Sequence, residues 1–195
     1  GMICVIEVMG RHAGWLTAAT RLANEKGCGP DLIYLPEVAF DMDKMLADVK
    51  KIYAETGKVI IAVSEGVQTK DGVFIPELVA KDAVAVDSFG HKQLGGTASV
   101  LAEFIKKETG AKVRGIELSL MQRCASHCAS QIDIDESFLA GRTAVIKALE
   151  GMTDYMVGFE REAGSDYKCN TKMIPLNDVA NTEKKVPLEW INNDG

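Results

Sequence analysis

The chain has 195 residues, 47% of them hydrophobic and 26% charged, which is ordinary for a globular protein with a sizeable core. Its net charge of −6 argues against a nucleic-acid-binding surface, and no apolar run reaches the length of a membrane span. Five cysteines, an odd number, do not suggest a disulfide framework. We therefore expect a reduced, cytoplasmic protein with no secretory signal, membrane partner or nucleic-acid partner.

The first third of the chain alternates short apolar runs with helical patterns. Buried strands are predicted over residues 3–8, 32–35 and 59–63, and helices over residues 13–26 and 41–56. Asp41 is a residue type that caps helix N-termini, and glycines at 27 and 57 follow the two helices. This order predicts an α/β fold, a mostly parallel sheet flanked by helices and joined by right-handed crossovers.

The remainder of the chain is less uniform. Residues 68–96 resemble an insertion, with a turn at 70–72 and a short helix over 76–81. A helix over 97–109, a strand over 112–121, a helix over 135–149 and a hairpin over 155–161 and 168–175 are predicted after it. We expect an α/β domain over residues 1–122 and a C-terminal helix and hairpin region over residues 123–195.

Two strands of the predicted sheet end in residues suited to a ligand. Met9, Gly10 and Arg11 follow the first strand, and Glu65 follows the third. Ligands of parallel sheets lie off the carboxyl ends of the strands, so these residues are expected to share a site. The start of the following helix and the Arg11 guanidinium would both favour a phosphate. The alternative interpretation is a tight turn, with Arg11 in a surface ion pair.

A metal site is not expected. Cys124, His127 and Cys128 lie close together in the sequence, but zinc sites usually need four ligands, often in two clusters, and the sequence has no second cluster.

Three segments, in order, resemble one known family. They read Val-Met-Gly-Arg-His-Ala-Gly-Trp-Leu at 8–16, Ile-Ile-Ala-Val-Ser-Glu-Gly at 60–66, and Arg-Gly-Ile-Glu-Leu-Ser-Leu-Met-Gln-Arg at 114–123, followed by Ser-His-Cys-Ala-Ser at 126–130. The sequence is similar to the phosphofructokinase family from residue 3 to about residue 159. The string Gln-Arg-Cys-Ala-Ser-His-Cys-Ala-Ser at 122–130 is more like the pyrophosphate-dependent branch.

The resemblance implies roles for individual residues. It makes Arg11 catalytic, because the family's arginine here neutralises the phosphoryl group in flight. It makes Met9, Gly10 and Glu65 contacts to the sugar, Arg114 a phosphate ligand that can reach across a subunit interface, and Arg123 a contact to the sugar ring. Leu120 stands where the family commonly has a polar phosphosugar contact, and a leucine supplies no hydrogen bond.

The implied reaction is transfer of a phosphoryl group from pyrophosphate, with Mg²⁺, to the 1-hydroxyl of fructose 6-phosphate, in a homo-oligomer that is a dimer or tetramer. The resemblance places the family's Gly-rich donor loop and the loop with its general base ahead of residue 8, and neither motif occurs in the chain. We therefore expect the chain alone to be inactive, Mg²⁺ to be bound mainly by the missing donor domain, and residues 135–175 to pack against that domain. An ATP-dependent kinase, a non-catalytic sugar-phosphate-binding regulatory subunit and a structural α/β domain remain open.

Overall fold

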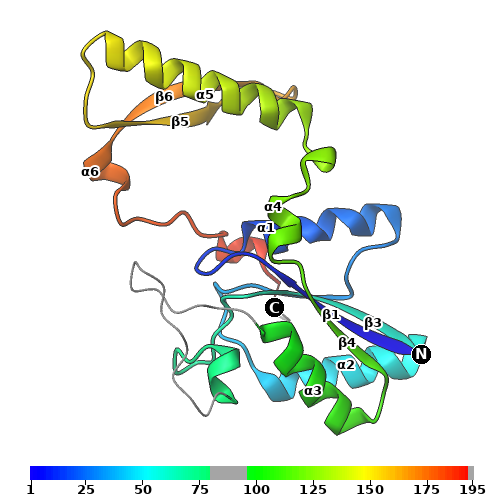
Figure 1. Ribbon diagram of the computed structural model, residues 1–195. Coiled ribbons are helices and arrows are strands. Elements are labelled where there is room, and N and C mark those ends of the chain that lie inside the picture. The colour runs from blue at the N-terminus through cyan, green and yellow to red at the C-terminus, as the bar shows by residue number, and fades with distance from the viewer. Residues whose placement is uncertain (80–95, 193–195) are drawn as a thin grey trace. The chain divides into compact units, whose positions relative to one another are not determined.

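The computed structural model describes residues 1–79 and 96–192. The chain divides into two compact units (Figure 1). The first unit contains residues 1–123 and the C-terminal stretch from residue 184, and the second contains residues 124–183. The sequence-based division at residue 122 stays a prediction, since a compact unit is not by itself an independently folding domain.

The first unit is built on a parallel sheet of four strands, in the order β2-β3-β1-β4. The strands are β1 (Met2–Val8), β2 (Leu32–Tyr34), β3 (Lys58–Ser64) and β4 (Val113–Glu117). β1 pairs in parallel with both β3 and β4, and β2 pairs in parallel with β3. The predicted α/β fold with a mostly parallel sheet is confirmed.

Helices α2 (Met42–Thr56) and α3 (Thr97–Thr109) cover one face of this sheet (Figure 1). The Asp41 carboxylate caps α2, accepting the N–H groups of Asp43 and Lys44 at 2.9 Å each. Both helices end at a glycine in the left-handed region, Gly57 with φ 71° and Gly110 with φ 65°. The sequence predicts these ends because both glycines directly follow the last helical residue.

The opposite face carries α1 (Trp15–Ala19) and the 3-10 helix η1 (Thr20–Lys26) (Figure 1). The helix that the sequence predicts over 13–26 is present over 15–26, but only its first five residues are α-helical. The Thr20 hydroxyl donates to the Thr17 carbonyl at 2.6 Å, at the point where α1 changes into η1. A side chain that takes a backbone carbonyl in this way competes with regular helical pairing.

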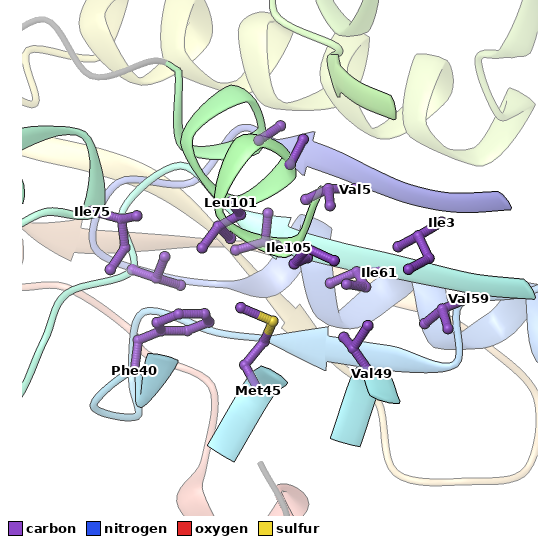
Figure 2. Packing of buried hydrophobic residues seen from close by; sticks show 14 residues of the cluster. Ile3, Val5, Phe40, Met45, Val49, Val59, Ile61, Ile75, Leu101 and Ile105 are labelled. Carbon is purple, nitrogen blue, oxygen red and sulfur yellow. The ribbon is translucent and has the colours of Figure 1, made fainter. Parts of the chain in front are cut away.

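The main hydrophobic core lies between the sheet and α2 with α3. In β1 the alternate residues Ile3 and Val5 are fully buried, as expected of a strand with one face on the core. Figure 2 shows these side chains close to those of the two helices. The buried members of this cluster are Ile3, Val5, Phe40, Met45, Val49, Val59, Ile61, Val63, Val67, Ile75, Ala98, Leu101, Ala102 and Ile105.

Residues 65–79 connect β3 to the part of the chain that precedes α3. A bridge joins Gln68 to Phe74, and Gly72, with φ 75°, lies in the predicted turn. The predicted helix over 76–81 is instead the 3-10 helix η2 (Ile75–Leu78). The rest of the predicted insertion, residues 80–95, lies outside the described residues.

The predicted strand over 112–121 is wrong at its C-terminal end. β4 stops at Glu117, and Ser119, with φ 39°, turns the chain into the short helix α4 (Leu120–Arg123). An apolar run that includes Leu118, Leu120 and Met121 does not distinguish a strand from a helical turn by periodicity alone.

The second unit consists of one long helix and a hairpin. Its elements are η3 (Ser126–Cys128), α5 (Gln131–Leu149), β5 (Tyr155–Arg161), β6 (Cys169–Pro175) and α6 (Leu176–Val179). The predicted helix and hairpin are present, and α5 begins at Gln131, after Ser130, rather than at residue 135. The remaining 3-10 helix, η4 (Leu188–Trp190), belongs to the first unit.

Candidate functional site

The topology of the sheet selects one edge for a ligand. The chain leaves β1 towards α1 on one face and leaves β3 towards α3 on the other, so the direction of winding changes between these two neighbouring strands. Open α/β sheets bind ligands at the carboxyl ends of the strands at such a switch point. The segments after β1 and β3 are therefore the first place to look for a site.

The segments after β1 and β3 are hydrogen-bonded to each other. The Glu65 N–H donates to the Val8 carbonyl at 3.0 Å, and the Gly10 N–H donates to Glu65 Oε1 at 3.2 Å. The Ser64 hydroxyl donates to the Gly10 carbonyl. The structure thus brings together four residues that the sequence predicted for one site, Met9, Gly10, Arg11 and Glu65.

Two glycines permit this close approach. A Cβ atom on Gly66 would lie 1.7 Å from the Arg11 carbonyl oxygen, so no side chain fits at this position without moving the backbone. Gly10 has φ 150°, and a Cβ there would lie 2.7 Å from the Ala13 carbonyl oxygen. Gly66 is therefore as necessary to the position of Arg11 as Gly10, although sequence reasoning gave Gly66 no packing role.

A third segment joins the site through Gln122 in α4. Its Oε1 atom accepts the Met9 N–H at 2.8 Å, which places α4 at the same edge of the sheet. Leu120 and Arg123, the first and last residues of α4, both have exposed side chains. Sequence reasoning missed Gln122, although it stands inside a quoted motif, because the predicted strand extended to residue 121.

Arg114 does not join this group within one chain. In the register of the sheet it lies opposite Cys4, and its side chain is exposed on the edge strand β4. Cys4 precedes Met9 by five positions, which corresponds to roughly 16 Å along an extended strand. Within one chain, Arg114 therefore lies apart from Met9, Gly10 and Arg11.

The start of α1 is occupied by a carboxylate. Glu37 Oε1 accepts the N–H of Gly14, the N-cap residue of α1, at 2.8 Å, and the N–H of Val186 at 2.9 Å. The Trp15 indole also donates to the Lys184 carbonyl at 2.6 Å, which fastens the C-terminal stretch over α1. The expectation that this helix start favours a phosphate stays a prediction, and the arginines are further candidate phosphate ligands.

A buried carboxylate, Glu7, lies two residues before Met9 in the sequence. Glu7, only 5% exposed, accepts the Ala98 N–H on Oε2 at 2.9 Å. Burial raises the pKa of Glu7, and nearby Glu117 and Glu65 also raise it, whereas the hydrogen bond from Ala98 lowers it. At this edge of the sheet, arginine side chains can donate hydrogen bonds to phosphoryl oxygens, and the Glu65 carboxylate can accept a hydrogen bond from a hydroxyl group.

Among residues 1–79 and 96–192, no group of three or more His, Cys, Asp or Glu side chains could hold a metal ion. Within the same ranges, no helix combines the length and apolar character that crossing a bilayer requires.

Comparison with known proteins identifies one family. The family model described as Phosphofructokinase matches residues 1–126. The chain is 40% identical over 194 residues to a pyrophosphate–fructose 6-phosphate 1-phosphotransferase of Halomonas elongata, covering 99% of the chain and 45% of that protein. It is 42% identical over 197 residues to the Xanthomonas campestris protein of the same name, covering 99% of the chain and 46% of that protein.

A solved structure is similar along almost the whole chain. The pyrophosphate-dependent phosphofructokinase from Nitrosospira multiformis superposes with a TM-score of 0.80 at 34% identity, covering 99% of the chain and 44% of that protein. The chain thus spans slightly less than half the length of these three proteins.

Proposed function

The chain belongs to the phosphofructokinase family, and we propose that it forms the fructose 6-phosphate-binding half of a pyrophosphate-dependent phosphotransferase. The observation that carries this proposal is the hydrogen-bonded junction of the loops after β1 and β3, with Gly10 bound to Glu65. The names of the relatives supply the substrates, fructose 6-phosphate and pyrophosphate.

In the proposed reaction, Arg11 neutralises charge on the phosphoryl group as it moves to the 1-hydroxyl of fructose 6-phosphate. Such transfers depend on positioning and electrostatic stabilisation, which a guanidinium at the end of a rigid strand supplies. Its position is supported by the contact between Gly66 and the Arg11 backbone. Arg11 is accordingly proposed as the catalytic residue of this half.

The other residues of the edge would hold the sugar. The Glu65 carboxylate accepts a sugar hydroxyl, Met9 and Gly10 contact the sugar through backbone and apolar atoms, and Arg123 reaches the sugar ring. Leu120, exposed beside them, supplies an apolar contact in place of a hydrogen bond.

Arg114 belongs to this proposal through a second subunit. Its exposed position on the edge strand β4, away from Arg11, suits a residue that reaches the phosphate of a neighbouring chain's site. We accordingly propose a homo-oligomeric, cytoplasmic enzyme.

Mg²⁺ is proposed as the cofactor of the whole enzyme, and it would neutralise charge on the phosphoryl donor. Its protein ligands are proposed to come mainly from the donor domain, together with oxygens of the substrate phosphates. The general base that accepts the proton of the 1-hydroxyl would lie there too, and the chain alone should not catalyse the reaction.

Calorimetric titration with fructose 6-phosphate tests the proposal. We expect weak, saturable binding to the chain, loss of binding in Arg11→Ala, and unchanged binding in Arg142→Ala, an exposed arginine of α5. Absence of binding to the folded chain, or equal binding by Arg11→Ala, would contradict it. Binding of ATP or pyrophosphate in place of the sugar phosphate would assign the site to the donor.

A further inference from the structure

Glu7 is a buried carboxylate that the proposed reaction does not use. It continues the face of β1 that carries Ile3 and Val5, so the alternation of the strand directs it towards α3 rather than towards solvent. A charged residue at a core position is costly unless it is hydrogen-bonded. The presence of this buried carboxylate, two residues before Met9, therefore needs a structural reason.

The side chain of Glu7 begins one hydrogen-bonded path to the loop after β1. Its Oε2 atom accepts the Ala98 N–H in the first turn of α3. From the same turn, the Thr97 hydroxyl donates to the Glu65 carbonyl at 3.3 Å, and the Glu65 carboxylate accepts the Gly10 N–H. These hydrogen bonds connect the first turn of α3 to the backbone of Gly10.

The backbone of Glu7 begins a second path. Its carbonyl accepts the Leu118 N–H at 3.2 Å, directly before the chain turns into α4. Gln122 of α4 then accepts the Met9 N–H. The N–H groups of Met9 and Gly10 are therefore both held by residues that Glu7 anchors, one through β4 and one through α3.

The structure also explains why α3 comes so near. Gly115 lies opposite Val5 in the sheet, and a Cβ atom there would lie 2.8 Å from the Ala98 carbonyl oxygen. Only a glycine lets the first turn of α3 reach the sheet at this height, where the Glu7 carboxylate meets it.

We propose that Glu7 is a positioning residue, whose buried carboxylate holds α3 against the sheet and so fixes the Met9–Gly10 loop for the sugar phosphate. The inference concerns the geometry of the loop in the free chain, and it rests on the proposed function only in naming the ligand.

The same arrangement makes the loop sensitive to pH. The carboxylates that act on Glu7 are Glu117, directly opposite it on β4, and Glu65 after β3. Since the pKa of Glu7 is raised in the folded chain, its contribution to stability is complete below the carboxyl pKa of the unfolded chain and is lost as the pH rises through the folded value. The Glu117→Gln variant should move this step to lower pH.

Amide hydrogen exchange of Met9 and Gly10, measured by NMR without ligand, tests the proposal. Glu7→Leu removes the side-chain acceptor of the Ala98 N–H, and we expect exchange of the Gly10 amide to accelerate on the order of tenfold because that hydrogen bond is lost. The Met9 amide, whose path starts from the Glu7 backbone carbonyl, should change less. Glu7→Gln keeps an acceptor but does not ionise. The protection of the Gly10 amide, taken relative to the exchange rate of an unstructured amide at the same pH, should therefore no longer show the step that Glu7 causes.

Val59→Ala provides the matched control, because it weakens the same core at the opposite end of the sheet, where Val59 pairs with Ile3. If the Gly10 amide responds to Glu7→Leu no more than to an equally destabilising Val59→Ala, Glu7 is merely structural and the inference is wrong. If Glu7→Leu fails to fold, the pH dependence of stability is compared among the unaltered chain, Glu7→Gln and Glu117→Gln. The inference is also wrong if stability changes at the same pH in all three. Failure of the chain to bind fructose 6-phosphate would contradict the proposed function alone, because the exchange experiment uses no ligand.

Discussion

The two units differ in how much of their apolar side-chain surface is buried within the described residues. In the first, Leu101 of α3 is fully buried against a sheet of four strands. In the second, Leu149 of α5 is 84% exposed, Phe138 is 73% exposed, and no residue of α5 is buried. A comparable share of apolar residues thus builds a core in one unit and an open surface in the other. The proposed binding edge lies in the unit whose backbone is fixed by a core.

Replacing one leucine in each unit gives the largest contrast. Leu101→Ala leaves a cavity in the core and should lower the free energy of unfolding by about 2–5 kcal/mol. Leu149→Ala should change it by less than about 0.5 kcal/mol, since its side chain is already exposed. Trp15 and Trp190, whose rings lie 5.9 Å apart in the first unit, report its denaturation by fluorescence, and circular dichroism follows α5. A similar loss in both variants would show that Leu149 is buried in solution.

Two glycines should respond with opposite sign. Gly66→Ala forces a methyl group onto the Arg11 backbone and should cost about 1–3 kcal/mol of stability, together with the binding of fructose 6-phosphate. Gly141→Ala, within α5 where a Cβ meets nothing within 4 Å, should stabilise its helix by about 0.5–1 kcal/mol. Denaturant titrations of both variants measure the two effects. Normal stability and binding in Gly66→Ala would show that the two segments are not in contact.

Two glutamines give a smaller contrast. Gln122→Ala removes the acceptor of the Met9 N–H and should cost about 0.5–1.5 kcal/mol, with faster exchange of that amide. Gln131→Ala removes a surface hydrogen bond to Asp135 and should be nearly neutral. Thermal denaturation and amide exchange compare the pair. Unchanged exchange at Met9 would mean that Gln122 does not hold the loop.

Two tyrosines should titrate abnormally for different reasons. Burial, with a smaller effect of Asp48, raises the pKa of Tyr34 in the first unit. In the second unit, a hydrogen bond to Glu136 is the main cause that raises the pKa of Tyr167 to about 12. Glu136→Gln should lower only the pKa of Tyr167, observable by ultraviolet absorbance titration. An unchanged titration would show that this surface hydrogen bond does not persist in solution.

Local sequence signals account for much of the first unit. Asp41, Gly57 and Gly110 mark helix ends by their own chemistry and were predicted in place. The meeting of the two segments that carry Arg11 and Glu65 was predictable too, because parallel strands bring their carboxyl ends to one edge. These inferences need only the pattern of the chain and the rule for parallel sheets.

Contacts that depend on register and close packing were not predictable from the pattern. Arg114 falls opposite Cys4 only because β4 pairs with β1 in that register, which no local motif encodes. Gln122 reaches Met9 because β4 stops early, and Glu7 meets Ala98 because Gly115 lets α3 approach. The sequence therefore predicts the candidate residues that follow the ends of strands. It does not predict the residues whose contacts hold them in position.

An NMR-detected titration of the chain with fructose 6-phosphate tests the proposed edge most directly. We predict saturable shifts of the amides of Met9, Gly10, Arg11 and Glu65, with the amides of α5 unchanged. Shifts confined to α5, or no saturable shift at the four residues in the folded chain, would contradict the assignment of the sugar-phosphate site to the switch point between β1 and β3.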